Sequence, residues 1–424
     1  MTAAIPSDAS QDAALAPAKS KSAIVFIFVT VVLDMIGFGI IMPVLPLLIE
    51  SVGQMPLAEA AKMGAWMFAA YALAAFAFGP FLGNLSDRFG RRPLLLLAVA
   101  GLGFDYLLHA LAPTLGWLFV GRILAGLCGA SWVIANAYIT DVTQPEERGR
   151  YFGMLGAAFG LGFILGPAIG GLLGEYGARV PFYAAATISL LNFAFGYFIL
   201  PESLPLENRR AFDWRRANPF AVFGVFATYK GVLPLVAVLA LFFFATSVYQ
   251  AIWSFWSIAK FNWSPAMVGL SLAAFGIVTA VFQGALSGLG ARVFGEARLV
   301  LIGLCLGAAV LVGYGLVAAP WMVFALMVVH GPEGFVHPMI TAILTRLAPE
   351  DAQGELQGGL SGIMSLSMLA GTVFFGQVFG YFMSGAAPMS SPDVGFWIAG
   401  GIVGAAALLF AWVMPHALRA KPRA

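Results

Sequence analysis

Ionisable side chains deep inside apolar runs are the residues of this sequence best placed to do chemistry. Asp34 lies eleven positions into an apolar stretch, about 17 Å along a helix and near its middle. Asp105 and Arg122 stand on either side of the Pro113 turn, so two antiparallel helices would bring them to similar depth. Each such group costs about 2.5 kcal/mol or more at the centre of a bilayer unless it faces protein or water. We therefore predict that Asp34 is a proton-coupling acid and that Asp105 pairs with Arg122, either as a purely structural pair or as one that breaks on protonation.

A second polar group is formed by His330, Glu333 and His337, which are spaced three and four residues apart. On a regular α-helix this spacing places all three on one face. Histidine titrates near neutral pH, so the stripe is suited to exchanging protons or to contacting a substrate. The alternatives are a satisfied structural cluster and a divalent metal site; we expect no metal here and count Glu333 with Asp34 and Asp105 as a proton-coupling residue.

The composition predicts the elements that must position these residues. Of 424 residues, 61% are hydrophobic and 10% are charged, which excludes a soluble globular protein. Apolar runs of about 20 residues fit membrane-spanning helices, and the chain has room for twelve of them with short loops. The expected helices cover residues 23–48, 64–82, 93–112, 115–138, 152–173, 181–200, 233–256, 266–289, 299–317, 321–344, 356–382 and 394–414.

The fold class we predict is an all-α membrane protein with two pseudo-symmetric six-helix halves. The longest charged interruption separates the halves, and the sequence after helix two is echoed after helix eight, at residues 83–87 and 284–288. Repeats of this kind commonly place a substrate site near mid-membrane between the halves. The expected divisions are an N-terminal tail (1–22), a first bundle (23–200), a linker (201–232), a second bundle (233–417) and a C-terminal tail (418–424).

The distribution of basic residues predicts orientation and partners. Of the 22 lysines and arginines, 18 fall on the side that holds both termini and the linker, so we expect both termini to be cytoplasmic. They are spread between apolar runs, which gives no support to a nucleic-acid partner. The expected partners are the lipid bilayer, protons and a small-molecule substrate, with the protein acting as a monomer.

Several motifs resemble those of the major facilitator superfamily. Residues 83–92 (GNLSDRFGRR) resemble its signature loop between helices two and three. Residues 33–46 and 162–171 resemble motifs of twelve-helix drug:proton antiporters. Residues 353–358 and 104–106 narrow the resemblance to the tetracycline-efflux subgroup. The resemblance implies a multi-pass protein of a bacterial-type inner (plasma) membrane.

The signature loop implies a conformational latch that holds the outward-facing state. Its small glycine permits close helix approach, and its charges would pair with neighbouring helix ends, either at Asp141 or at the positive N-terminal end of helix eleven. The alternative is that the arginines only enforce orientation. The latch residues are Gly83, Asp87, Arg88, Arg91, Arg92 and Asp141.

Helix five carries glycines four residues apart, so two helices can meet there at backbone distance. The resemblance associates this element with antiporters, in which close packing limits leakage of the coupling ion; ordinary small-residue packing is the alternative. The motif comprises Gly162, Gly166, Pro167, Gly170 and Gly171, and Gly174 continues the ridge.

The resemblance also implies that helices one, four, seven and ten line the cavity. The expected substrate-binding residues are Arg122, Tyr249, Gln250, Trp253, His330 and His337, a mixture of aromatic and polar groups that suits an amphiphilic organic ligand. Where tetracycline exporters usually have Gln, His and Asp, this chain has Ala75, Thr279 and Val310. These differences leave the prediction of proton antiport unchanged, whereas they make tetracycline a doubtful substrate.

These observations predict a proton-coupled antiporter that exports a small amphiphilic organic compound by alternating access. It needs no cofactor and is driven by the proton gradient. Rival functions are proton-coupled transport of a metabolite or lipid, and a non-transporting membrane sensor of the same fold. We expect that the protein is not an enzyme, because the sequence contains no recognisable nucleotide-binding loop, zinc motif or nucleophile elbow.

Overall fold

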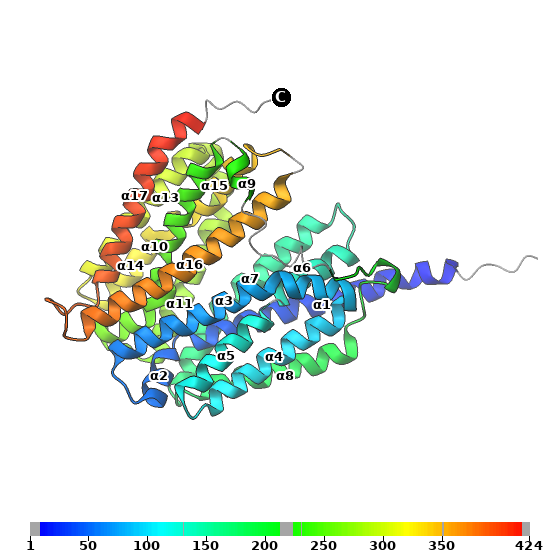
Figure 1. Cartoon of the computed structure of the whole chain (residues 1–424), viewed down its shortest axis with the longest axis horizontal. Helices are drawn as coiled ribbons and strands as arrows, with labels where there is room; N and C mark the ends of the chain where they lie inside the picture. The colour runs from blue at the N-terminus through cyan, green and yellow to red at the C-terminus, as the bar shows by residue number, and fades with distance from the viewer. Residues whose placement is uncertain (1–8, 130, 213–223, 230, 350–351, 418–424) are drawn as a thin grey trace, which may run out of the picture.

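The computed structural model describes residues 9–129, 131–212, 224–229, 231–349 and 352–417. Within these residues every regular element is a helix, and twelve segments are long and apolar enough to span a membrane. Figure 1 shows them gathered in two bundles, one from each half of the chain. The predicted all-α fold with twelve membrane-spanning segments is confirmed.

Within the described residues, the first bundle contains eight α-helices, and the second contains eight α-helices together with one π-helical and one 3-10 helical segment. The first comprises α1 (Ala9–Ile41), α2 (Leu45–Gly53), α3 (Leu57–Phe89), α4 (Arg91–Leu111), α5 (Leu115–Cys128), α6 (Ser131–Val142), α7 (Arg148–Gly174) and α8 (Val180–Ile199). The second comprises α10 (Val232–Phe261), α11 (Pro265–Ala280), the π-helical η3 (Val281–Leu286), α12 (Ser287–Phe294), α13 (Glu296–Leu316), α14 (Pro320–His330), the 3-10 helix η4 (Gly331–Phe335), α15 (Val336–Thr345), α16 (Gln353–Met383) and α17 (Val394–Ala417). Between them lie η1 (Leu206–Asn208) and α9 (Val225–Thr228).

The first apolar stretch differs from its prediction as a single helix over residues 23–48. The helix begins earlier, at Ala9, within the expected tail, and ends at Ile41; α2 starts separately at Leu45. Pro43 and Pro46 explain the division, because proline lacks the backbone N–H that a continuous helix requires. Residues 1–8 and 418–424 of the expected tails and 213–223 of the expected linker lie outside the described residues.

The signature segment at residues 83–92 is mostly helical rather than a loop. α3 continues to Phe89 and α4 begins at Arg91, so that Gly90 alone joins them. Gly90 has a φ of 105°, and an added Cβ would overlap the carboxylate of Glu202. Both the left-handed backbone and the close carboxylate require glycine at this joint.

The two bundles are in contact at one end and apart at the other. We call them the α2 end, which carries α2 and the α7–α8 turn, and the linker end, which carries the α3–α4 joint and the end of α8 (Figure 1). At the α2 end, Ser254 Oγ donates to Met42 O at 2.8 Å and Ala266 N donates to Glu175 Oε1 at 2.9 Å. This backbone N–H, together with the Ser264 hydroxyl, lowers the pKa of the exposed Glu175 carboxyl.

The glycines of α7 also pack closely toward the α2 end and loosely toward the linker end. An added Cβ at Gly166 would lie 2.8 Å from Gly39 Cα of α1, and one at Gly171 would lie 2.5 Å from Pro265 O of α11. The helix-five ridge therefore packs at backbone distance, as its spacing predicts. Toward the linker end, Cβ atoms at four further glycines of α7 would meet nothing within 4 Å: Gly149, Gly153, Gly156 and Gly160.

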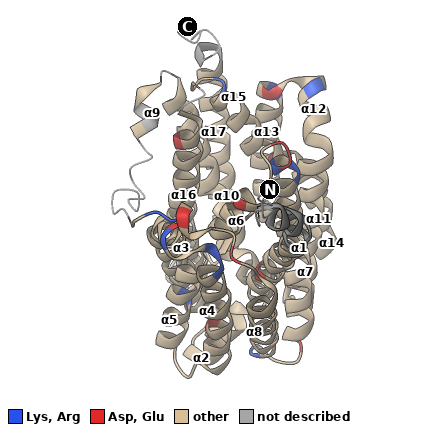
Figure 2. Cartoon of the chain, turned by 90° about the vertical axis from the view of Figure 1, so that its right-hand side faces the viewer, with Lys and Arg blue, Asp and Glu red and all other residues tan. Residues whose placement is uncertain are grey.

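Charged segments occupy little of the helical surface, as the mostly tan ribbon in Figure 2 shows. The most hydrophobic spans carry their charges at their ends or, where a charge lies deep, against another polar group. The deep groups form the candidate site described below.

Valine at Gly170 should destabilise the protein, because its Cβ would overlap the Ile40 backbone. Overpacking of this kind costs about 1–3 kcal/mol. Valine at Gly156 on the same helix has open space and serves as the matched control. Thermal unfolding in detergent should show a lower Tm for Gly170→Val only; equal shifts for both variants would contradict the packing.

Candidate functional site in the membrane core

The first cluster of deep polar groups is a buried triad in the N-terminal half. Arg122 Nη2 of α5 donates to Asp105 Oδ2 of α4 at 3.1 Å, as the depth argument predicts. Arg122 Nε also donates to His109 Nε2 at 3.0 Å, and sequence reasoning missed this histidine. All three side chains are buried, Asp105 and His109 completely. The guanidinium that we expect to bind substrate is thus committed to two protein partners in this conformation.

The tautomer of His109 follows from these bonds. Arginine donates and never accepts, so His109 Nε2 must present a lone pair to it, and the ring proton is on Nδ1. Nδ1 lies 2.9 Å from the Asp105 carbonyl oxygen and 3.0 Å from Asp105 Oδ1. The carbonyl oxygen has the alignment of a hydrogen bond, whereas Oδ1 has no hydrogen-bond donor among the described residues. A Cβ at Gly121 would lie 2.6 Å from that Oδ1, so the absence of a side chain at position 121 makes room for the triad.

Asp34 lies beside this triad on α1 and is also buried, with 5% of its surface exposed. The Ser131 side chain of α6 hydrogen-bonds to it. The buried phenols of Tyr71 and Tyr106 lie near Asp34, Asp105 and Arg122. The two predicted acids of this half therefore lie near the same pair of phenols.

The second cluster lies within the C-terminal half, around Glu333. His330 Nε2 lies 3.0 Å from Glu333 Oε2, and Tyr249 OH of α10 donates to the same oxygen at 3.4 Å. Tyr314 OH of α13 lies 3.4 Å from His330 Nδ1. A Cβ at Gly307 of α13 would lie 2.7 Å from Glu333 Oε2, so here too a glycine makes room for the carboxylate.

His337 does not share the face of His330 and Glu333, contrary to the prediction from α-helical spacing. Residues 331–335 form the 3-10 helix η4, which has about three residues per turn. That pitch aligns residues three apart and turns His337 away. His337 is exposed, and its ring packs against Phe243 with centroids 5.3 Å apart. Pro332, in the first turn of η4, removes a backbone donor and explains the departure from α-helix.

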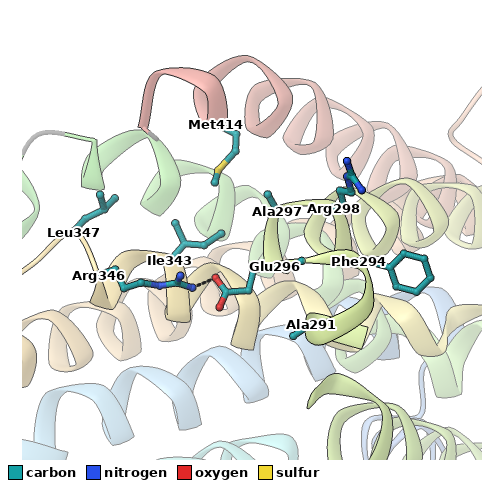
Figure 3. Close-up of a pocket in the computed structure, with 10 residues that line it drawn as sticks. Ala291, Phe294, Glu296, Ala297, Arg298, Ile343, Arg346, Leu347 and Met414 are labelled. Atoms are coloured by element: carbon teal, nitrogen blue, oxygen red, sulfur yellow. Dashed lines mark hydrogen bonds and ion pairs between the residues drawn. The ribbon is translucent and has the colours of Figure 1, made fainter. Parts of the chain in front are cut away.

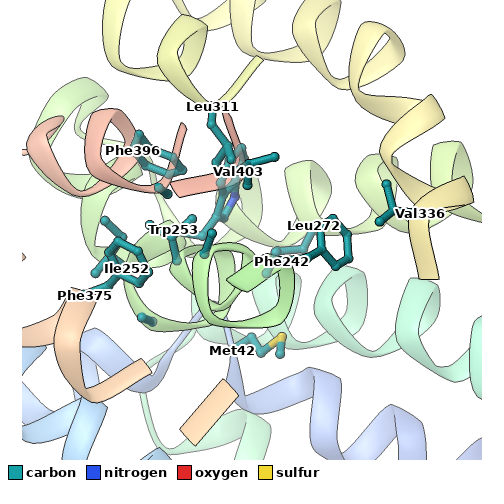
Figure 4. Packing of buried hydrophobic residues seen from close by; sticks show 14 of the residues in the cluster. Met42, Phe242, Ile252, Trp253, Leu272, Leu311, Val336, Phe375, Phe396 and Val403 are labelled. Carbon is teal, nitrogen blue, oxygen red and sulfur yellow. The ribbon is translucent and has the colours of Figure 1, made fainter. Parts of the chain in front are cut away.

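The aromatic residues expected to bind substrate line the contact between the halves. Tyr249, Gln250 and Trp253 border a cavity of about 20 Å³ together with Met42 and Phe68 of the first bundle. Figure 4 shows Met42 of the first bundle next to the helix that carries Trp253. The space is sufficient for about one water molecule, so these residues line a closed part of the interface in this conformation.

The predicted latch residues form an ion-pair network inside the N-terminal half. Arg91 Nη1 lies 2.5 Å from Asp87 Oδ1, and Arg91 Nε lies 3.1 Å from Asp141 Oδ2. The backbone N–H of Arg91 donates to Glu202 Oε1 at 2.8 Å. Of the two proposed partners, Asp141 is the one engaged here.

The remaining latch residues contribute less than expected. Arg92 Nη2 donates to Tyr197 O at 2.6 Å, and the Arg88 guanidinium lies 5.1 Å from the centre of the Phe89 ring. Gly83 does not mediate a close helix approach: its Cβ would lie 3.6 Å from Val133, an ordinary contact. The bundles are apart at this end, which explains the missing approach.

The C-terminal half holds the counterpart of this latch with its charges reversed. Gly295, with a φ of 75°, joins α12 to α13 as Gly90 joins α3 to α4. The next residue is Glu296, which pairs with Arg346 at the end of α15, whereas Arg91 pairs with Asp141 near the end of α6. The pair borders a pocket of about 530 Å³ at the linker end (Figure 3).

Comparison with known proteins shows which family has this architecture. The model of the Major Facilitator Superfamily matches residues 27–259 and 235–424. The chain belongs to this superfamily. This major facilitator is 38% identical over 388 residues to the class C tetracycline resistance protein of Escherichia coli, covering 90% of this chain and 94% of that protein. It is 33% identical to the class D tetracycline resistance protein of Salmonella ordonez, with the same two coverages.

Solved structures share the fold of this major facilitator at lower identity. The human organic anion transporter MFSD10 (TETRAN) matches with a TM-score of 0.68 and 22% identity over 92% of this chain and 99% of that one. A bacterial homologue of the human lysosomal transporter Spinster matches with a TM-score of 0.75 and 16% identity over 95% and 98%. The protein is a multi-pass membrane transporter of small molecules and not an enzyme.

Two of the residues that sequence reasoning missed, His109 and Gly121, could have been recognised from their spacing. His109 follows Asp105 by four residues, the spacing of neighbours on one helical face, and Gly121 directly precedes Arg122. Tyr71 and Tyr314 had no comparable signal, since their helices pack against the acids only through tertiary structure. Among the described residues, no group of three or more His, Cys, Asp and Glu side chains is placed to hold a metal.

Asp141→Asn and Arg91→Gln should each destabilise the N-terminal half, because each leaves a partly buried charge with one partner fewer. The expected cost is about 1–3 kcal/mol. Since the two residues are in contact, the double variant should lose less than the sum of the singles. Arg88→Gln, at an exposed arginine of the same motif, is the control. If thermal unfolding shows the same loss of stability for Arg88→Gln as for Arg91→Gln, the ion-pair network does not stabilise this half.

Proposed function

We propose that this protein is a proton-coupled antiporter that exports a small amphiphilic organic compound by alternating access. One observation carries the proposal: each half holds a buried carboxylate within hydrogen-bonding distance of a histidine ring in the membrane core. These pairs are Asp105 with His109 and Glu333 with His330, each 3.0 Å apart. Acid and imidazole groups at this depth are costly to keep and are typical of proton pathways.

The proposed coupling residues are Asp34, Asp105 and Glu333. Proton and cargo would bind in competition, so that protonation from one side releases cargo and deprotonation on the other restores affinity. One elementary charge crossing 100 mV supplies about 2.3 kcal/mol, enough for roughly a 50-fold gradient of cargo. The proton gradient then drives export without a cofactor.

The proposed cargo is amphiphilic because of the side chains at the interface of the halves. Tyr249 and Trp253 offer aromatic surface, and Gln250 offers an amide beside them. Aromatic surface with few polar groups suits an organic ligand with both characters. The relatives named as tetracycline resistance proteins support a drug-like compound, while Ala75, Thr279 and Val310 argue for a cargo other than tetracycline.

We further propose that the linker end is cytoplasmic, that the membrane is a bacterial-type inner membrane and that the unit is a monomer. The bias of lysine and arginine toward the linker end supports this orientation. In it, the conformation described here has its halves together on the outer side and apart on the inner side. Alternating access would then close the linker end and separate Gly171 from α11.

Proteoliposomes with an acidic lumen test the antiport, with tetracycline and a fluorescent amphiphile as probe cargos and a pH dye inside. We expect cargo uptake together with loss of luminal protons. Glu333→Gln and Asp34→Asn should reduce the proton movement at least tenfold, because an amide cannot carry a proton. Asp393→Asn, which removes a carboxylate paired with Lys260 outside both clusters, controls for general damage. Cargo flux with no opposing proton movement would reject antiport, and proton movement in the same direction as cargo would indicate symport.

Cysteine labelling in intact cells tests the orientation. In a background with Cys128 and Cys305 replaced by serine, a membrane-impermeant maleimide should label Tyr176→Cys, which is 82% exposed at the α2 end. It should not label Glu207→Cys, which is exposed at the linker end, until the cells are opened. The reverse pattern would show that the orientation is wrong.

A further inference from the structure

We propose that His109 is the proton-accepting positioning residue of the N-terminal cluster: by taking up a proton it moves Arg122 from Asp105 to Asp34. This inference rests on the proposed proton coupling and adds to it a residue and a step. His109 lies outside the predicted coupling and binding residues, yet it is completely buried and directly bonded to Arg122.

The hydrogen bonds of the neutral ring define what protonation would change. His109 Nε2 accepts from Arg122 Nε at 3.0 Å, so a proton on Nε2 would replace an acceptor by a second donor and place two cations in contact. Arg122 would then lose its position. On the other side of the ring, Asp105 Oδ1 lies 3.0 Å from Nδ1 and has no donor in the described structure. This carboxylate is ready to neutralise the imidazolium in place of Arg122.

Charge balance limits the number of protons that the cluster can hold. The cluster has two carboxylates, Asp34 and Asp105, and one guanidinium, so with a neutral His109 and both acids ionised it would carry a net charge of −1 in the membrane core. Uncompensated buried charge is strongly unfavourable, so one proton is held. Two arrangements are then possible. In one, Asp34 holds the proton and Arg122 pairs with Asp105. In the other, His109 holds the proton and Arg122 pairs with Asp34.

The surroundings allow this exchange of partners. The charged groups that face the ring are Asp105 on its own helix and Arg122 on α5. α8 contributes Phe182, whose ring stacks on the imidazole at 5.5 Å with a 6° angle between planes and adds no charge. The buried Tyr71 of α3 lies near Arg122, Asp34 and Asp105 and adds no charge as a neutral phenol. In the exchange one proton leaves the Asp34 carboxyl and one arrives at Nε2, and no bond between heavy atoms changes.

Nitrogen NMR of the full chain, labelled at histidine and reconstituted in liposomes without cargo, tests the proposal. At high pH one ring should carry its proton on Nδ1, and that signal should be absent from His109→Gln, whose amide can still bond both neighbours. Lowering the pH should convert the ring to imidazolium. In Asp34→Asn the midpoint should fall by about one pH unit or more, because the remaining charges balance without the proton. His416→Gln, beyond the last spanning residue, should leave this titration unchanged.

The outcomes separate this inference from the proposed function. A His109 midpoint that is equal in wild type and Asp34→Asn, or a ring that never titrates between about pH 5 and 9, overturns the inference. Proton-coupled transport with an unaltered pH profile in His109→Gln also overturns it and leaves antiport intact. A coupled titration in a protein that moves no protons against cargo supports the inference and rejects the proposed function.

Discussion

The cost of burying charge in a membrane core is the constraint on which this structure depends. Asp105, Arg122 and Glu333 are nearly or completely buried, and each is within hydrogen-bonding distance of another polar side chain. Such groups are tolerated only when they face protein or water. The helices around them therefore have to approach closely enough to supply partners, and this requirement explains features of the sequence that have no charge at all.

Glycine is the clearest of these features. At Gly121 and Gly307 the missing side chain leaves room for a carboxylate, and at Gly166 it lets two backbones touch. The glycines of α7 that face open space near the linker end, such as Gly156, have no partner in this conformation. A helix that alternates between contact and separation can keep small residues along its whole length, because each end must pack in one of the two states. The proposed rocking of the two halves would account for this uneven packing of α7.

Sequence reasoning placed side chains correctly where local helix and turn geometry determines their positions, and it failed where tertiary packing determines them. Asp105 and Arg122 were placed together correctly because a turn of known position sets the depth of both. His337 was placed wrongly because Pro332 changes the helical pitch between it and Glu333, and a face assigned by α-helical spacing does not survive such a change. His109 could have been found from its spacing to Asp105, whereas the contact of Tyr314 with His330 depends on how α13 packs against α14 and no local pattern encodes it.

The ion-paired joints at Gly90 and Gly295 show which part of a repeated element is fixed by geometry and which is free. Gly90 and Gly295 both have positive φ values and both join consecutive membrane helices, so the backbone joint is the same in the two halves. The ion pair that follows it has opposite polarity: Arg91 with Asp141 in one half, Glu296 with Arg346 in the other. Coulomb attraction depends on the product of the charges and not on which helix carries which sign. A duplicated unit can therefore exchange the signs without losing the pair, and a comparison of the halves by residue type alone would miss a correspondence that the backbone preserves.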